Sequence, residues 1–518
     1  MSKSFYITTA IDYVNGHPHL GHAYEKIITD VIARARRSLG ETVFYLTGLD
    51  EHGQKVQQSA VRQQLDPQTY CDGLAASWKE FATSLDLSIS DFVRTTSPAH
   101  QSVVQAILDK LHREDQFYQA EYHGFYSAKE ETFLTERDRR EDGTFDPFYG
   151  EVIELTERNY YFKLQVRQQW LIDHVEAHPE FIYPDYRRNE VLGFLRNHTL
   201  EDLCITRPVA RLNWGIPLPF DPDYVTYVWF DALVNYLSVP AAHGDPLVTR
   251  ALGLPTPPAG PGPELWPADA HVIGKDILKF HAVYWPIMLK AMGLPLPRQI
   301  LVHGFWQKNA MKISKTTGNI VEPHAVISEW GLDAFRFYVV RELDIGPDGN
   351  WTDEGFAARY QAELANGLGN LVNRSLSMLQ RYREGRVPAR HEELAGEVSV
   401  KVEQTAEALR QHRLQAALVS IWSLITRANQ YVDQTAPFKL AKDPSQASRL
   451  DQVLYNLVET TRILATMLWP FLPATARRIH EQLALDGDPD AWKATRWGGL
   501  SEGHLIGTPV PLFPRRDK

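Results

Sequence analysis

The chain has 518 residues, enough for several domains that each bury a core of their own. Its apolar share is 44%, and no uncharged apolar run approaches the roughly 18 residues of a membrane span, so an integral membrane protein is not expected. A net charge of −10 argues against indiscriminate nucleic-acid binding, so an RNA partner would have to meet a local basic surface.

The first 115 or so residues alternate strand-like and helix-like segments, as a parallel α/β sheet requires. Strands are expected over residues 6–10, 43–47 and 92–94. Short aromatic-rich strands, charged turns and a helix over residues 166–178 then interrupt this pattern between residues 117 and 205. We interpret this stretch as an inserted domain.

The α/β pattern resumes after the insertion, with strands expected over residues 224–230, 271–274 and 300–304. One parallel sheet has therefore been split by the insertion. Beyond residue 350 no further strands are expected. Long amphipathic helices over residues 352–383, 394–435 and 445–483 predict a helical bundle there.

Two features of the sequence predict a cytoplasmic location. Cys71 and Cys204 are the only cysteines and lie far apart, so a disulfide framework is not expected. The N-terminal residues enter an expected strand directly and contain no signal-peptide hydrophobic region.

The string His19-Leu20-Gly21-His22 carries the first chemical signal. It follows an apolar run and opens a stretch with helical spacing of apolar residues, which predicts a strand-to-helix turn. Free backbone N–H groups and the positive end of the helix dipole meet at such a turn and stabilise a polyphosphate. The two imidazoles would add further donors.

The second signal is the string Lys312-Ile313-Ser314-Lys315-Thr316, which follows the expected strand over residues 300–304. Its two ammonium groups suit a flexible loop that closes over departing pyrophosphate. Either string alone has an ordinary reading, a chance match or a solvated loop. Their order, their strand context and their flanks favour a site that activates a carboxylate with ATP.

This pair resembles the two signature motifs of class I aminoacyl-tRNA synthetases. Neighbouring strings at residues 10–16, 47–53, 227–232 and 274–281 narrow the resemblance to the methionyl-tRNA synthetase family, and it runs nearly end to end. It implies a Rossmann-type sheet in two halves, an inserted knuckle domain, a lysine-loop region and a helical anticodon-binding domain. The two halves of the sheet correspond to residues 1–116 and 224–308, and the inserted domain to residues 117–223. The lysine-loop region corresponds to residues 309–350 and the anticodon-binding domain to residues 351–518.

The resemblance implies a ligase that activates L-methionine with ATP to methionyl-adenylate, releases pyrophosphate and transfers methionine to the 3′ end of tRNA(Met). Most of the catalysis would be positioning and electrostatic stabilisation, with Mg²⁺ accompanying the nucleotide. The expected catalytic residues are His19, His22, Lys312 and Lys315. The expected ATP-binding residues are His19, His22, Glu25, Gly274, Asp276 and Lys315.

The amino-acid pocket must hold an ammonium group and an unbranched thioether. By resemblance, Asp50 would bind the ammonium with help from the backbone near Ile11. The other members of the expected methionine-binding set are Tyr13, Trp229, Ala232, Leu233, Tyr236, Ile277 and His281. Taken singly, Trp229 would more often be a core residue, and an Asp after a strand often only caps a helix. Discrimination of sulfur from methylene should be modest.

Many relatives carry a zinc knuckle of paired cysteines in the insertion, which a four-ligand zinc site requires. This chain has Ser127-Ala128-Lys129-Glu130 at the first pair and no cysteines near residues 146–150. We expect no structural zinc and a knuckle held by the aromatic residues Tyr122, Phe125, Tyr126, Phe133, Phe145 and Tyr149. A hard-ion site from Glu130, Glu131, Asp142 and Asp146 is the weaker alternative.

The helical region should read the tRNA anticodon. By resemblance, Asn370 and Arg374 lie one helical turn apart and would hydrogen-bond bases. Phe438 occupies the place of a usual tryptophan and would stack on a base, although it could instead be a loop residue that packs on the bundle.

Two other functional classes stay open. A class I enzyme for leucine, isoleucine or valine would ordinarily need a larger editing insertion, and a non-catalytic tRNA-binding paralogue would not need the histidines and lysines. Initiator and elongator tRNA(Met) are both expected partners, with no membrane partner. No appended β-barrel follows the helical region, so a monomer is expected.

Overall fold

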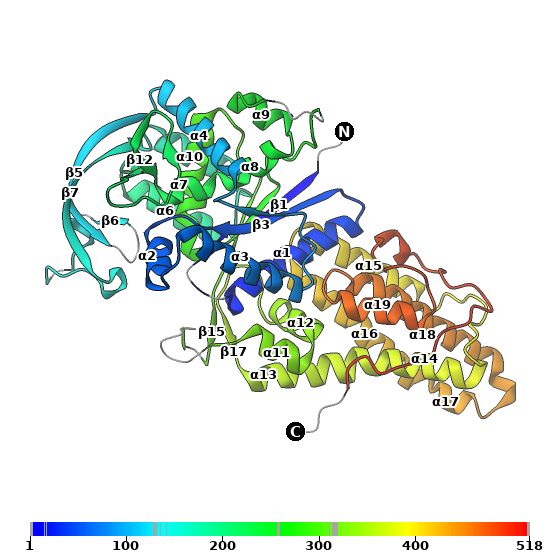
Figure 1. Cartoon of the computed structure of the whole chain (residues 1–518). Helices are drawn as coiled ribbons and strands as arrows, with labels where there is room; N and C mark the ends of the chain where they lie inside the picture. The colour runs from blue at the N-terminus through cyan, green and yellow to red at the C-terminus, as the bar shows by residue number, and fades with distance from the viewer. Residues whose placement is uncertain are drawn as a thin grey trace. The chain divides into compact units, whose positions relative to one another are not determined.

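The computed structural model describes residues 4–14, 16, 18–127, 132–134, 136–140, 142–255, 260–309, 311–312 and 320–514, with the backbone alone at residues 132, 133, 137, 311 and 312. The chain forms two compact units. Unit 1 comprises Met1–Pro18 and Phe44–His303, and unit 2 comprises His19–Val43 and Gly304–Lys518. Figure 1 follows the chain through both units.

A seven-stranded sheet forms the centre of unit 1, and its strands pair in the order β2-β3-β1-β13-β14-β8, with β4 also paired to β3. The register is parallel at the pairs β1/β13, β13/β14, β14/β8, β2/β3 and β3/β4. The strands are β1 (Phe5–Thr9), β2 (Asp12–Tyr13), β3 (Val43–Asp50), β4 (Asp91–Arg94), β8 (Ile182–Tyr183), β13 (Ala270–Gly274) and β14 (Ile300–His303). β1 and β13 are buried throughout, as parallel strands covered on both faces are.

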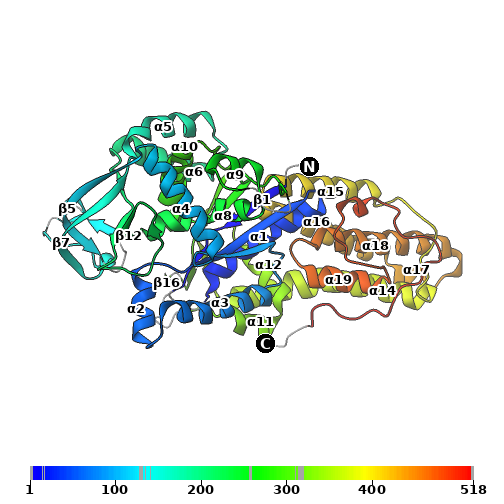
Figure 2. The ribbon, with the colours of Figure 1, turned by 45° about the horizontal axis from the view of Figure 1, so that its top comes forward.

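The split sheet expected from the sequence is confirmed by the register of β1 against β13. Ile7 pairs with Ala270, although almost the whole of unit 1 lies between them in sequence. In the sequence between β1 and β13, β5 (Phe117–Ser127) and β7 (Val152–Phe162) form a long antiparallel hairpin, visible in both Figure 1 and Figure 2. Each has 11 residues, so the expectation of only short strands in this stretch was wrong.

The hairpin belongs to a four-stranded sheet with β6 (Thr132–Leu134) and β9 (Leu203–Cys204). The helices α5 (Gln168–Ala177) and α6 (Asp185–Asn197) follow it, and α5 confirms the helix expected over residues 166–178. β8, which lies between these helices, returns to the parallel sheet and pairs with β14. The chain between the two halves of the sheet thus also supplies its edge strand.

The strand expected over residues 224–230 is wrong in its second half. β12 (Asp221–Thr226) pairs antiparallel with β10 (Thr206–Pro208) and β11 (Pro217–Leu218) in a separate small sheet. The helix α7 (Val228–Leu233) begins two residues later and is followed by α8 (Asn235–Ala242). An aromatic and β-branched run has strand propensity, but tertiary packing decides its structure here.

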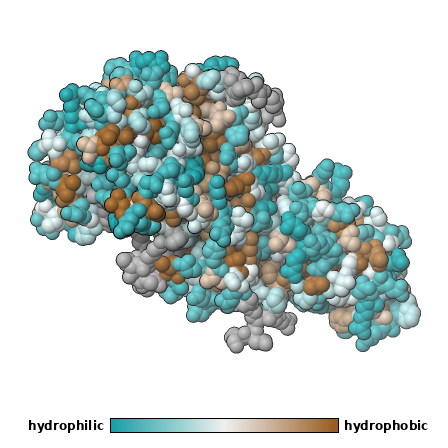
Figure 3. Space-filling model, in the orientation of Figure 1, coloured by the Kyte–Doolittle hydropathy of each residue, from teal (hydrophilic) through white to brown (hydrophobic). Residues whose placement is uncertain are grey.

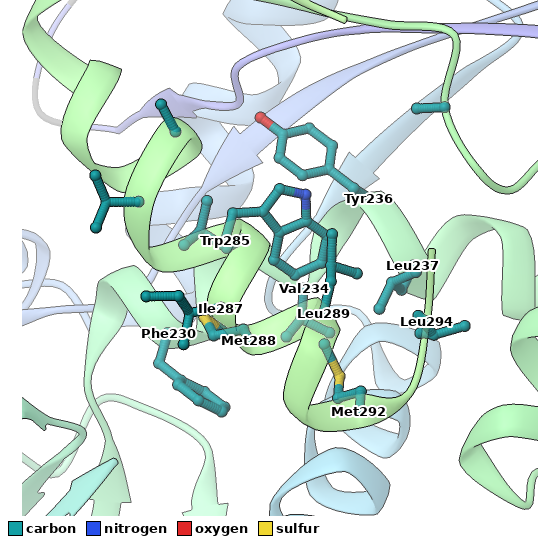
Figure 4. Packing of buried hydrophobic residues seen from close by; sticks show 14 of the residues in the cluster. Phe230, Val234, Tyr236, Leu237, Trp285, Ile287, Met288, Leu289, Met292 and Leu294 are labelled. Atoms are coloured by element: carbon teal, nitrogen blue, oxygen red, sulfur yellow. The ribbon is translucent and has the colours of Figure 1, made fainter. Parts of the chain in front are cut away.

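The core of unit 1 packs α7, α8 and α4 (Pro98–Arg113) against α10 (Trp285–Met292). Figure 4 shows Phe230, Val234 and Leu237 facing the side chains of α10, with Tyr236 beside the indole of Trp285. The remaining α-helices among the described residues of unit 1 are α2 (Gln54–Arg62), α3 (Pro67–Ser84) and α9 (Pro246–Leu252).

Unit 2 begins with the helix α1 (Leu20–Ser38). It also contains a three-stranded sheet of β15 (Trp306–Lys308), β16 (Met311–Lys312) and β17 (Gly349–Trp351), and the helices α11 (Pro323–Trp330) and α12 (Leu332–Glu342). A buried carboxylate fixes α1 in this unit. Asp30 accepts hydrogen bonds from Arg34 at 2.8 Å and from Arg336 of α12 at 2.7 Å.

The rest of unit 2 is the expected helical bundle, yellow-green to red in Figure 1. Its elements are α13 (Asp353–Arg359), a π-helix (Tyr360–Gly369), α14 (Asn370–Arg383), α15 (Ala395–Arg410), α16 (Leu414–Thr435), α17 (Pro437–Leu440), α18 (Ala447–Leu468) and α19 (Pro473–Gln482). The single helices expected over residues 394–435 and 445–483 are each broken into shorter ones. His412 adopts a left-handed conformation between α15 and α16, and prolines separate α18 from α19.

The visible face of the molecule is mainly hydrophilic and carries small separate hydrophobic patches (Figure 3). Within the described part of the chain, every helix is too short or too polar to cross a membrane.

Candidate functional site

The two histidines of the first motif form the start of α1. The Nδ1 atom of His19 accepts the Gly21 N–H at 3.1 Å, and that of His22 accepts the His19 N–H at 3.1 Å. Their rings stack with centroids 3.7 Å apart. An imidazole nitrogen that accepts a hydrogen bond carries no proton, so each ring keeps its proton on Nε2. The strand-to-helix turn predicted from the sequence is confirmed.

Glu25 lies on the next turn of α1 and is 8% exposed. Lys312 ends the short strand β16, where only its backbone is described. Lys315 lies outside the described residues. The histidines and Glu25 therefore belong to unit 2 together with the backbone of Lys312.

The residues expected to bind methionine all belong to unit 1. Asp50 is the last residue of β3 and is 5% exposed, and its Cα is in register with that of Tyr13 on β2. Its carbonyl oxygen accepts the Val14 N–H at 3.1 Å. Ile11 lies between β1 and β2 and packs on the core. Asp50 and Tyr13 thus meet at the carboxyl end of the parallel sheet, where α/β proteins bind ligands.

Trp229, Ala232 and Leu233 lie on α7, and Tyr236 lies on α8. The indole of Trp229 stacks on Phe280 with centroids 3.7 Å apart and planes 10° apart. Trp229 is therefore a partly buried helix residue held by an aromatic partner, where the sequence suggested a strand.

Tyr236 and His281 are 1% and 2% exposed and share a hydrogen bond of 2.8 Å between the hydroxyl and Nε2. The Nδ1 atom of His281 lies 3.0 Å from the carbonyl oxygen of Ile277, which can only accept. Nδ1 must therefore carry a proton, and in the neutral ring Nε2 accepts from the Tyr236 hydroxyl. Ile277 holds His281 through its backbone.

His271 packs against the ring of Tyr236. Its ring lies 4.1 Å from that of Tyr236, its Nδ1 lies 2.8 Å from the Thr8 hydroxyl, and its Nε2 accepts the Trp285 N–H at 3.3 Å. Burial, reinforced by the nearby His281, lowers the pKa of His271 well below its usual value. His271 is therefore a neutral ring that fixes the position of Tyr236.

Gly274 ends β13, and Asp276 lies exposed in the 3₁₀ turn that follows. A Cβ atom at position 274 would come within 2.6 Å of an Asp276 carboxylate oxygen. Glycine therefore lets this carboxylate lie against the end of the strand. In unit 1 the sequence-predicted residues thus lie on β2, β3, α7, α8, the end of β13 and the turns after it.

The expected anticodon residues lie in the helical part of unit 2. Asn370 and Arg374 are on α14, and the guanidinium of Arg374 pairs with Asp433 of α16 at 3.0 Å. Phe438 lies on the short helix α17 and is 44% exposed. It is a helix residue rather than a loop residue, and much of its ring faces solvent.

The insertion shows part of the expected aromatic packing. Phe125 and Phe145 lie 5.1 Å apart, and the guanidinium of Arg139 covers both rings. The hydroxyl of Tyr122 donates to the Leu134 carbonyl at 2.5 Å. Tyr126 is 2% exposed, and Tyr149 packs edge-to-face on Phe148. Only the backbone of Phe133 is among the described residues.

The alternative hard-ion site finds no support among the residues described. Asp142 accepts two hydrogen bonds from Thr144, and Asp146 pairs with Arg140 at 2.6 Å. Glu130 and Glu131 lie outside the described residues. No cluster of three or more potential ligands that could hold a metal is found in the described part of the chain.

Sequence reasoning gave no role to three buried residues beside the methionine set: His52, His100 and Asp231. His52 and Asp231 lie within the strings at residues 47–53 and 227–232, so their position next to Asp50 and Ala232 was a usable signal. His100 carried none, because only the fold brings it to Asp231.

Two family models match consecutive parts of this chain. The model described as tRNA synthetases class I (M) matches residues 5–142 and 149–376, and the anticodon binding domain of methionyl tRNA ligase matches residues 383–517. Together they cover both units.

Full-length relatives agree with these models. The chain is 39% identical to the methionine–tRNA ligase of Caldanaerobacter subterraneus over 526 residues, which cover 100% of this chain and 80% of the relative. It is also 39% identical to that of Bacillus subtilis over 532 residues, which cover 99% of this chain and 78% of the relative.

Solved structures are similar over the same length. The Mycobacterium tuberculosis methionyl-tRNA synthetase in complex with methionyl-adenylate matches with a TM-score of 0.89 and 35% identity, covering 99% of this chain and 100% of that one. The apo form of that enzyme matches with a TM-score of 0.83 and 33% identity, covering 100% of this chain and 99% of that one.

Proposed function

Because this chain belongs to the methionyl-tRNA synthetase family of class I aminoacyl-tRNA synthetases, we propose that the residues gathered in unit 1 bind methionine and that α1 and the lysine loop bind ATP. The enzyme is a methionine–tRNA ligase. It activates L-methionine with ATP to methionyl-adenylate and transfers methionine to tRNA(Met). One observation carries this conclusion: a catalytic and an anticodon-binding family model match consecutive parts of the chain.

Asp50 binds the ammonium group of methionine, with the backbone near Ile11. A buried carboxylate at the carboxyl end of the sheet supports this role, because it gains most from a cationic ligand. The thioether lies among the aromatic side chains of Tyr13 and Trp229. Ala232, Leu233, Tyr236, Ile277 and His281 complete the pocket.

Sulfur is recognised mainly by contact with ring edges. In neutral His281 the Tyr236 hydroxyl already donates its proton to Nε2, so the sulfur would have to compete for that proton. Sulfur is a weak acceptor that packs well against aromatic edges. Norleucine should therefore remain a competitor of methionine.

His19 and His22 present Nε2 protons to the phosphates of ATP, since both Nδ1 atoms are occupied at the start of α1. Glu25, Gly274 and Asp276 bind the ribose of ATP or of the adenylate. Lys312 and Lys315 close over the pyrophosphate as it leaves. Mg²⁺ accompanies the nucleotide, held mainly by its phosphates, and no structural zinc is needed.

The proposed role of the lysine loop is tested by Lys315→Ala. The loss of one such transition-state contact costs about 3 kcal/mol, so ATP–pyrophosphate exchange should fall roughly 100-fold. Methionine binding should stay nearly intact, because the lysine acts on the pyrophosphate. Unchanged exchange would remove the loop from the mechanism.

The helical part of unit 2 reads the tRNA anticodon through Asn370, Arg374 and Phe438. The position of Asn370 and Arg374 on α14 and the exposure of Phe438 support this assignment. Charging of initiator and elongator tRNA(Met) transcripts with labelled methionine tests it. Equal charging of a transcript with a foreign anticodon would contradict it.

That the enzyme acts as a cytoplasmic monomer stays a prediction from the sequence. Sedimentation equilibrium of the purified chain and cell fractionation would check it.

A further inference from the structure

One buried carboxylate joins three segments of unit 1 that are far apart in sequence. Asp231 of α7 is 0% exposed, and its Oδ2 accepts from Nδ1 of His52 at 2.5 Å. Its Oδ1 accepts from Nε2 of His100, in the first turn of α4, at 2.6 Å. Asp231 therefore connects the chain just beyond β3 with α4 and α7.

The chain of hydrogen bonds continues to α8. Nδ1 of His100 lies 2.9 Å from the Ser238 hydroxyl, whose oxygen is 3.2 Å from the Asn235 carbonyl. His52, His100 and Ser238 are each no more than 3% exposed. A buried polar network thus reaches the helix that carries Tyr236.

The network holds a charge away from water. A carboxylate has no proton to donate, so His52 and His100 must supply both protons. Burial alone would raise the pKa of Asp231, but the charges and hydrogen bonds of His52 and His100 outweigh it and hold this pKa below its usual range. Well-packed apolar residues often fill such a position at no loss of stability, so stability alone does not account for the network.

We propose that Asp231 is a positioning residue for methionine recognition, a role that rests on the proposed function. His52 lies two residues after Asp50, which binds the ammonium group, and Asp231 lies between Trp229 and Ala232, which line the thioether pocket. Asp231 thereby fixes the distance between the two ends of the substrate. Small misplacements of such groups are costly to a bound substrate.

The test is Asp231→Asn in ATP–pyrophosphate exchange with the full-length enzyme. The amide nitrogen of Asn cannot accept a hydrogen bond, so one histidine loses its acceptor and its segment shifts. KM for methionine should rise about tenfold or more, while kcat and KM for ATP change by no more than about threefold. A KM for methionine within about twofold of the unaltered enzyme would overturn the proposal.

Asp245→Asn is the matched control, because Asp245 is 1% exposed in the same unit and accepts hydrogen bonds from four backbone N–H groups. These belong to Leu247, Val248, Leu265 and Trp266. This variant should lower the melting temperature and leave KM for methionine unchanged. If it raised that KM as much as Asp231→Asn does, general destabilisation would explain both, and the proposal would fail.

Variants of His52 and His100 test the positioning role of Asp231 if Asp231→Asn does not fold. His52→Asn and His100→Gln keep an N–H near the positions of Nδ1 and Nε2, whereas His52→Ala and His100→Ala remove it. KM for methionine should rise in the alanine variants and return toward normal in the amide variants. Equal KM values within each pair would refute the positioning role.

The unaltered enzyme separates this proposal from the proposed function. Absence of methionine-dependent exchange in that enzyme would overturn both. Methionine-dependent exchange together with an unchanged KM in Asp231→Asn would overturn only the role of Asp231.

Discussion

The residues of unit 1 proposed to bind methionine and the residues of unit 2 proposed to read the anticodon differ most in burial. Tyr236 and His281 are almost fully buried and share a hydrogen bond, and the ring of His271 packs against that of Tyr236. Phe438 is 44% exposed, and Arg374 pairs with the surface carboxylate of Asp433. The first set is buried and hydrogen-bonded within the fold, and the second presents accessible groups.

The two proposed ligands would account for this difference. A pocket distinguishes one methylene-sized group from another by only about 1 to 3 kcal/mol, so its geometry must be fixed to use that energy. An aromatic ring that stacks on a base tolerates small displacements, and it must be exposed to receive the base. Substitutions in the rigid cluster should therefore affect activation, and those in the exposed set should affect only charging.

The largest effect is expected for Asp50→Ala. Loss of one partner of a buried charge pair costs about 2 to 5 kcal/mol, so KM for methionine should rise roughly 100-fold or more. KM for ATP serves as the internal control, because the ammonium contact does not involve the nucleotide. A rise in KM for ATP alone would contradict the assignment of Asp50.

A smaller effect is expected for Tyr236→Phe. The substitution leaves the buried Nε2 of His281 without its donor, which costs about 1 to 3 kcal/mol. KM should rise about tenfold for methionine and for norleucine alike, since the hydroxyl proton goes to His281. A rise in KM for methionine but not for norleucine would show that the hydroxyl donates to sulfur. Tyr161→Phe, which removes a tyrosine hydroxyl outside the proposed methionine-binding set, is the matched control.

For Phe438→Ala the exchange reaction should be unchanged. Each base-aromatic stack contributes about 1 to 3 kcal/mol, so kcat/KM for tRNA(Met) in aminoacylation should fall about tenfold. The control Val419→Ala removes another exposed apolar side chain of the bundle, 50% exposed on α16. Equal charging by Phe438→Ala and the unaltered enzyme would exclude stacking.

The smallest effect on activity is expected at His412, which is buried in unit 2. Its Nε2 atom lies 3.1 Å from Nη2 of Arg36. Burial and the Arg36 charge lower its pKa to about 3. Its stability contribution is therefore full above about pH 6.5 and decreases as the pH falls toward about 3, because only the unfolded chain takes up a proton there. Between these two pH values, the free energy of unfolding falls by about 1.4 kcal/mol for each pH unit.

In His412→Asn the free energy of unfolding of the full chain should vary less between pH 5 and pH 7 when measured by urea titration, because the proton taken up by His412 on unfolding is lost. Asparagine tolerates the left-handed backbone at this position. Methionine activation should not change. An unaltered pH slope would show that His412 does not titrate in this way.

Much of the fold could be predicted from the sequence, because its signals are local. The buried strands β1, β13 and β14 and the turn at His19 have short apolar runs and helix-start patterns that identify them. The helix at Val228 was missed because aromatic and β-branched residues favour strands unless packing overrides them. The break at His412 was missed because the amphipathic pattern continues across it.

The site could be predicted only in its residue types. Resemblance selected Tyr236 and His281, but nothing local to either residue shows that His281 accepts the Tyr236 proton or that His271 supports both. Those facts depend on the Ile277 carbonyl and on Thr8 and Trp285, which the fold brings in from other elements. Long-range hydrogen bonds such as these have no sequence period.

ATP–pyrophosphate exchange with a panel of apolar amino acids tests the central claim most directly, because it reports amino-acid recognition without tRNA. Methionine should give the highest kcat/KM, norleucine should follow within about 1 to 3 kcal/mol, and leucine and isoleucine should give little exchange. Exchange driven by leucine or isoleucine but not by methionine would contradict the account.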